Sequence, residues 1–129
     1  MPTLRRNLRP TCLLLAAGLA AAACGSDEGP PAPAPATAAV SVGNIFFRSD
    51  RNATVNPSVD TVRAGGTVTW TWVAAGLHSV ESSGSPAFAG SDEFSDPGSQ
   101  VTVKFDSPGT YTYLCGIHGD AMTGRVVVE

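Results

Sequence analysis

Three residues with metal-binding side chains lie close together near the end of the chain. Cys115, His118 and Met122 fall within one glycine-containing stretch. A thiolate and an imidazole bind copper through soft donor atoms, and a weak axial thioether beside one cysteine and two histidines is the donor set of an electron-transfer copper site. The chain has 2 histidines, so the second imidazole would come from His78, which follows the strand-like run Thr67–Val73. These four residues predict a metal site if the fold brings His78 back to the turn.

Each of these residues also has an ordinary structural explanation. A free cysteine behaves as a small apolar side chain and a methionine fills gaps in a core, while a single histidine commonly lies at the surface. These explanations do not account for the spacing Cys-x2-His-x3-Met in one turn. Of the 3 cysteines, Cys12 and Cys24 belong to the start of the chain, so Cys115 has no disulfide partner within the domain. A bound metal would protect this thiol from oxidation.

The start of the chain has the features of an export signal. Three arginines, Arg5, Arg6 and Arg9, precede an apolar run over residues 12–23. This run is too short to span a bilayer as a permanent anchor. We therefore expect residues 1–23 to be a signal peptide and the protein to be exported, to the periplasm or the outer cell surface.

The end of this segment resembles the lipobox of bacterial lipoproteins, because small residues precede Cys24. The sequence predicts lipidation of Cys24, with ordinary signal cleavage near Ala23 as the alternative. Residues 24–39 are rich in proline and alanine, and we expect them to form a disordered tether. A lipid on Cys24 would be the only link between the protein and a membrane.

The charge balance bears on the binding partners. With 8 basic and 11 acidic residues the formal net charge is −3 at pH 7, and removal of the three signal arginines makes it −6. Nucleic-acid-binding proteins present a basic face, so nucleic acid is not an expected partner. An acidic surface instead favours encounters with cationic proteins.

The remaining residues, 40–129, have the pattern of a single all-β domain. Short β-branched and aromatic runs alternate with turn signals such as Pro108-Gly109, and no run keeps a helical period. The predicted strands are Val40–Phe47, Ser58–Val62, Thr67–Val73, His78–Ser82, Val101–Phe105, Thr110–Leu114 and Thr123–Glu129. Such a series of short strands predicts a two-sheet Greek-key β-sandwich.

Alternation within two of these strands predicts which side chains face the core. One inward row is Val68, Trp70 and Trp72, and the other is Tyr111, Tyr113 and Cys115. The second row ends at the thiol, which places Cys115 at one end of the core. Residues 83–99 are rich in glycine, serine and proline, and we expect a long loop there with one short edge strand near Glu93–Phe94.

The stretch from Asp106 to His118, followed by Met122, resembles the C-terminal copper loop of cupredoxins of the plastocyanin and pseudoazurin type. The stretch Gly66–Val80 is similar to the strand that carries the first histidine ligand in that family. The resemblance covers residues 40–129. It implies a cupredoxin sandwich with one type 1 copper per chain, held by His78, Cys115 and His118 as strong ligands and by Met122 as the long axial ligand.

Three positions depart from the plastocyanin pattern. Three residues separate His118 from Met122, one fewer than in plastocyanins and the same as in azurins. Ser79 stands where plastocyanins have an asparagine that braces the site, and a change beside the ligands can alter the reduction potential. Leu114 replaces the exposed tyrosine that plant plastocyanins offer to one partner.

The resemblance implies an exported monomer that transfers single electrons between redox proteins by cycling between Cu(I) and Cu(II). An apolar patch around His118 would be the docking surface, formed by Leu77, Gly116, Ile117 and Ala121. Enzymatic activity is not expected, because a cysteine, two histidines and a methionine leave no open position on the metal. The alternatives are a copper or zinc binding or carrier protein without redox duty, since cysteine and histidine also suit zinc, and a metal-free β-sandwich adhesion module.

Overall fold

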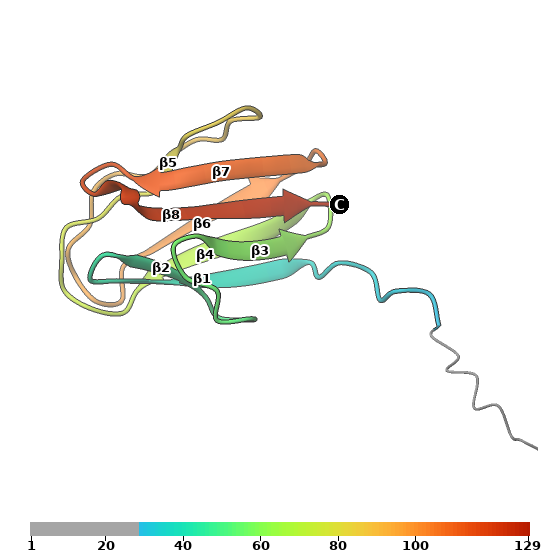
Figure 1. Cartoon of the computed structure of the whole chain (residues 1–129), viewed down its shortest axis with the longest axis horizontal. Helices are drawn as coiled ribbons and strands as arrows, with labels where there is room; N and C mark the ends of the chain where they lie inside the picture. Colours follow the sequence, from blue (N-terminus) through green and yellow to red (C-terminus); the bar gives the residue numbers. More distant parts are fainter. Residues whose placement is uncertain (1–28) are drawn as a thin grey trace, which may run out of the picture. The chain divides into compact units, whose positions relative to one another are not determined.

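The computed structural model of the protein describes residues 29–129, of which Ala32–Glu129 form one unit. The predicted signal peptide and Cys24 lie outside the described residues. Eight β-strands in two sheets form this unit, which confirms the predicted all-β sandwich (Figure 1). Between Gly29 and Glu129 there is no helix long and apolar enough to cross a membrane.

The first sheet has the strand order β2-β1-β4-β6 and the second has the order β3-β8-β7-β5. The strands are β1 (Thr37–Gly43), β2 (Phe46–Ser49), β3 (Ser58–Val62), β4 (Gly66–Trp72), β5 (Glu81–Ser82), β6 (Gln100–Phe105), β7 (Gly109–Cys115) and β8 (Gly119–Val128). The pairs β1–β4 and β3–β8 are parallel, and parallel neighbours need crossover connections. The chain accordingly crosses between the sheets at every connection from β2 to β7.

Three of the predicted strands differ in the structure. The strand expected at Thr123–Glu129 already begins at Gly119 as β8, so Met122 lies in a strand and not in the turn with Cys115 and His118. The run Val40–Phe47 is not one strand, because a turn at Asn44 and Ile45 divides it into β1 and β2. Ile45 has a φ of 57° there, and Gly43 pairs with Phe46, whose ring occupies the space that a side chain at Gly43 would need. The predicted strand His78–Ser82 shrinks to β5, with His78 making only a single bridge to Phe94.

The two predicted inward rows are confirmed. All six side chains are buried: Val68, Trp70 and Trp72 in β4, and Tyr111, Tyr113 and Cys115 in β7. Tyr113 lies at the centre, with edge-to-face contacts to Trp70 at 5.2 Å and to Phe47 at 5.0 Å between ring centroids. Its hydroxyl shares a hydrogen bond of 2.5 Å with Ser58. Contacts from both sheets therefore hold this ring in one position.

The two ends of the sandwich carry different parts of the chain (Figure 1). The β1–β2 turn, residues 73–80 and the β7–β8 turn lie at one end, which we call the distal pole. We call the other end the basal pole, and the segment before β1 and the C-terminal residue lie there. The Arg63 N–H donates to the carbonyl of Pro35, and the Ala64 N–H donates to the carbonyl of Glu129. Both segments that carry predicted metal ligands therefore meet at the distal pole.

A substitution at Gly124 would test how tightly the core is packed around Tyr113. The two residues are cross-strand neighbours in β7 and β8, and a Cβ at Gly124 would lie 2.2 Å from Cζ of the tyrosine ring. Because the ring has no room to move, we expect Gly124→Ala to lower the free energy of unfolding by about 1–3 kcal/mol, the usual cost of overpacking. Urea unfolding measures this change. In a Tyr113→Leu background the same substitution should cost much less, and an equal cost in both backgrounds would contradict the contact.

Candidate metal centre

His78 is held in place by its backbone. Its N–H donates to the carbonyl of Phe94 at 3.0 Å, and the Phe94 N–H donates back at 2.9 Å. The indole N–H of Trp72 also donates to the Phe94 carbonyl at 2.9 Å, and the two rings pack edge to face. The short edge strand expected near Glu93–Phe94 is only a single bridge between Phe94 and His78. This bridge, with the bond from Trp72, fastens His78 to the end of β4.

Cys115 is the last residue of β7 and is completely buried. A bulge interrupts the pairing between Leu114 and Cys115, after which Cys115 pairs with Gly119. The turn between them is closed by a hydrogen bond of 3.2 Å from the His118 N–H to the Cys115 carbonyl. Gly119 has a φ of 54°, a left-handed conformation that glycine adopts without steric cost. The turn therefore brings His118 back beside the sulphur.

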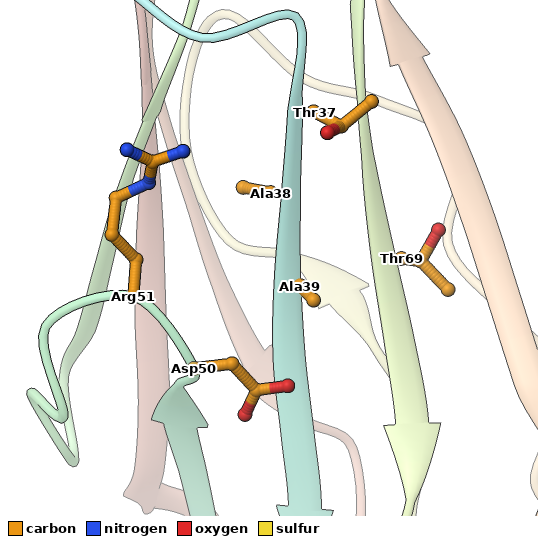
Figure 2. Close-up of a pocket in the computed structure, with 6 residues that line it drawn as sticks. All are labelled: Thr37, Ala38, Ala39, Asp50, Arg51 and Thr69. Atoms are coloured by element: carbon orange, nitrogen blue, oxygen red, sulfur yellow. The ribbon is translucent and has the colours of Figure 1, made fainter.

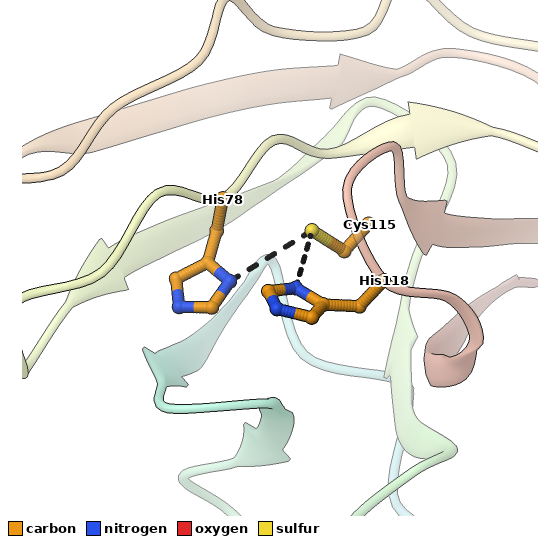
Figure 3. Close-up of side chains that lie close together, drawn as sticks. All are labelled: His78, Cys115 and His118. Atoms are coloured by element: carbon orange, nitrogen blue, oxygen red, sulfur yellow. Dashed lines mark hydrogen bonds between the residues drawn. The ribbon is translucent and has the colours of Figure 1, made fainter.

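The three side chains converge on one point (Figure 3). The Cys115 sulphur lies 3.8 Å from Nδ1 of His78 and 3.4 Å from Nδ1 of His118, and the three donor atoms all lie within 4.8 Å of one another. Bonds of about 2.0 Å to nitrogen and about 2.3 Å to sulphur, at tetrahedral to trigonal angles, place nitrogen and sulphur about 3.5–3.7 Å apart. The spacing therefore fits a single metal ion between the three atoms.

The surroundings of His78 favour its neutral form. Its side chain is 1% exposed, and burial, together with the nearby His118 ring, lowers the pKa of His78 below the usual value. A neutral imidazole keeps a lone pair for a metal. The ring also lies against Gly76, where a Cβ would come within 2.9 Å of Nε2 and where the φ of 148° suits glycine. Position 76 thus leaves room for the histidine.

The predicted axial residue is in the right region. Met122 is fully buried and faces the core from β8, and its neighbour Thr123 pairs with Leu114 of β7. The methionine therefore belongs to the same end of the core as Cys115. Its role as a metal ligand stays a prediction.

The predicted apolar patch is at the surface. Leu77 and Ile117 are 47% and 42% exposed, Gly116 and Ala121 are exposed, and His118 is half-buried. Two more apolar residues are exposed at the distal pole, Ile45 and Val73, and neither was predicted to be at the surface. Ile45 lies within the predicted strand Val40–Phe47 and Val73 ends the predicted strand Thr67–Val73, so nothing in the local sequence distinguishes them from core residues.

Two hollows lie away from the three donor residues. One of about 470 Å³ is formed on the first sheet by Thr37, Ala38, Ala39, Asp50, Arg51 and Thr69, with Asp50 and Arg51 reaching it from the segment after β2 (Figure 2). The other, of about 420 Å³, lies on the outer face of β7 and β8. Neither hollow is lined by His78, Cys115 or His118.

Sequence comparison places residues 48–129 in the family described as copper binding proteins of the plastocyanin/azurin family. A chloroplastic plastocyanin from Tetradesmus obliquus is 35% identical over 96 residues, which are 67% of this chain and 66% of that protein. A plastocyanin from Scenedesmus fuscus is 34% identical over 66% of this chain and 97% of its own length. The chain thus spans just under two thirds of the Tetradesmus protein and nearly all of the Scenedesmus protein.

Solved structures share the fold. A variant of amicyanin superposes with a TM-score of 0.56 at 24% identity, covering 70% of this chain and 80% of that one. A purple cupredoxin from Nitrosopumilus maritimus has a TM-score of 0.56 at 23% identity, covering 72% of this chain and 98% of its own. At these identities the likeness is one of architecture.

Cys115→Ser tests the donor cluster. A metal that binds only the folded state raises its free energy of unfolding, by about 4 kcal/mol at a thousandfold excess over Kd. A serine hydroxyl is a poor donor for soft metals, so we expect the variant to lose most of the stabilisation that added copper or zinc gives the wild type. Urea unfolding with and without metal measures the difference. The metal-free variant serves as the control for folding, and an unchanged metal effect would exclude Cys115 from the site.

The donor atoms, their spacing and the two-sheet fold agree with the sequence comparisons. A buried sulphur with two imidazole nitrogens is a donor set for copper. The chain therefore belongs to the copper-binding plastocyanin and azurin family, and is a cupredoxin with one copper ion as its cofactor.

Proposed function

We propose that the protein is a single-electron carrier whose copper is bound by His78, Cys115 and His118, with Met122 as the axial ligand. The observation that supports this most directly is the convergence of two imidazole nitrogens and one sulphur in a buried space. When bound, copper supplies the electron capacity by cycling between Cu(I) and Cu(II). The protein residues hold the ion and exclude water from it.

The rigidity of the site suits electron transfer. Cys115 and His118 come from one closed turn, and His78 is fastened through Phe94 to β4. A donor set held by the core changes little between the two oxidation states, and a small rearrangement makes electron transfer fast. The same completeness of the donor set favours electron transfer over a reaction on a substrate.

The exposed surface around His118 supports the docking of redox partners at the distal pole. Leu77 and Ile117 offer an apolar contact there. Between Arg63 and Lys104 the chain has four acidic residues and no lysine or arginine, and these four are Glu81, Asp92, Glu93 and Asp96. Complementary charge speeds encounter, so we propose a partner with a basic rim around its own apolar contact.

We also propose that the protein acts outside the cytoplasm as a monomer. The basis is the export signal expected at residues 1–23, the tether at residues 24–39 and the domain at residues 40–129. Cys24 is the proposed lipidation site and would provide the membrane anchor, in the periplasm or on the outer cell surface.

Spectroscopy of the copper-loaded domain separates the electron carrier from a copper or zinc carrier without redox duty. An electron carrier should show an intense visible band from the Cys115 thiolate bound to Cu(II), which disappears on reduction and returns on oxidation in a one-electron Nernst titration. Cys115→Ser is the matched control without the band. Copper-loaded protein that stays colourless under oxidant, or that binds only zinc, would favour the alternative.

Met122→Leu tests the axial ligand. Leucine has nearly the same volume but no donor atom, so the core should keep its packing. An axial thioether donor stabilises Cu(II) more than Cu(I), because Cu(I) is stable with three ligands. Loss of the thioether should therefore raise the reduction potential while copper stays bound. Voltammetry and the EPR spectrum of the Cu(II) form measure the change. Wild-type values for both would place Met122 in the core only.

A further inference from the structure

We propose that Glu81 is a positioning residue for the copper loop, acting through Ser79 on Gly116, and that its negative charge favours Cu(II). The three residues form what we call the Ser79–Glu81 brace. The proposal rests on the proposed function of the site, and it adds a residue that the sequence analysis did not single out.

One hydroxyl group joins the two ligand-bearing segments. The Gly116 N–H donates to Oγ of Ser79 at 3.0 Å, and the same hydroxyl donates to a carboxylate oxygen of Glu81 at 3.1 Å. Ser79 follows His78 and is 1% exposed, while Gly116 follows Cys115. A hydrogen bond to a carboxylate is stronger than one between neutral groups and strengthens the next bond in the chain. The brace therefore links Ser79, which follows the ligand His78, to Gly116, which follows the ligand Cys115.

Gly116 shows how close the carboxylate lies to the loop. A Cβ at this position would come within 1.8 Å of the Glu81 carboxylate oxygen and within 2.8 Å of the Ser79 hydroxyl. The φ of Gly116 is not among the left-handed ones, so its backbone does not demand glycine. A side chain at Gly116 would displace the exposed carboxylate of Glu81 from the loop and so break the brace.

The short strand β5 fixes the backbone of Glu81. Glu81 pairs with Leu114, the residue before Cys115, and Ser82 pairs with Tyr113. On the other side, the Ser91 N–H donates to the carbonyl of Val80 at 2.9 Å. The carboxylate is thus presented to the loop from a strand that is held on both sides.

The charge of Glu81 is not neutralised by an ion pair. Within residues 29–129 the one salt bridge joins Lys104 to Asp106. A negative charge next to the copper loop attracts the doubly charged ion more strongly than the singly charged ion. Glu81 should therefore lower the reduction potential, in addition to limiting the movement of the loop.

Variants of the brace separate the effect of charge from the effect of position. Glu81→Gln keeps an acceptor oxygen and removes the charge, so the reduction potential should rise while the Cu(II) visible and EPR spectra stay close to wild type. Glu81→Ala and Ser79→Ala remove the brace and should alter the spectra as well. Ser79→Thr keeps a hydroxyl at this position, so its reduction potential and its spectra should both stay close to wild type. Glu93→Gln is the matched control, because it removes one charge from a residue that makes no hydrogen bond to Ser79 or Gly116.

Amide hydrogen exchange of Gly116 in the zinc-loaded protein provides a readout that needs no copper chemistry. Loss of its hydrogen bond in Ser79→Ala should make exchange about tenfold faster, and Ser79→Thr should reverse the change. If Glu81→Ala makes exchange of the Gly116 amide faster but does not shift the reduction potential, Glu81 has only a structural role and its proposed effect on copper is wrong. If Glu81→Gln and Glu81→Ala both match Glu93→Gln in potential, spectra and exchange, the brace is refuted. A wild-type protein that never colours with copper would instead refute the electron-carrier function, while the exchange test of the brace would still stand.

Discussion

Bringing two imidazole nitrogens and a thiol sulphur together inside a protein is the constraint on which the distal pole depends. Polar groups taken out of water need partners, and His78 and Cys115 are almost fully buried. His78 comes from the connection between β4 and β5, whereas Cys115 is the last residue of β7, so the fold has to bring two distant segments together. A metal ion satisfies all three donors at once, and its binding energy then becomes part of the stability of the fold.

The sandwich meets this constraint by fixing the backbone on either side of the donors. On the His78 side, Phe94 links the ligand segment to Trp72 of β4. On the Cys115 side, β7 is anchored through Tyr113, whose ring and hydroxyl contact both sheets. The two sides are connected to each other by the hydroxyl of Ser79. The backbone beside each donor is therefore fixed by contacts of the protein itself, as preorganised sites require.

Much of this arrangement could be predicted from local sequence, for a physical reason. The inward rows ending at Trp72 and Cys115 follow from the two-residue period of a strand, and the grouping of Cys115 with His118 follows from their spacing. The convergence of His78 on them was expected and is found, while the roles of Ser79 and Met122 as brace and axial ligand stay predictions.

The parts that were missed depend on contacts between distant segments. The division of Val40–Phe47 into β1 and β2 is governed by how Phe46 packs over Gly43, which an apolar run does not reveal. The approach of Glu81 to Gly116 joins strand β5 to the turn after β7, and neither residue is distinctive within its own stretch of sequence. Period and propensity describe one segment at a time, so they carry no information on such pairs.

The two ends of the chain have a consequence for how the protein can be attached. The segment at Pro35 and the carbonyl of Glu129 both lie at the basal pole, and β1 separates that pole from His118 by about 20 Å, given about 3.3 Å per strand residue. A link made at Pro35 or at Glu129 would thus attach the sandwich by its basal pole. An electrode or a fused domain joined there would leave His118 uncovered.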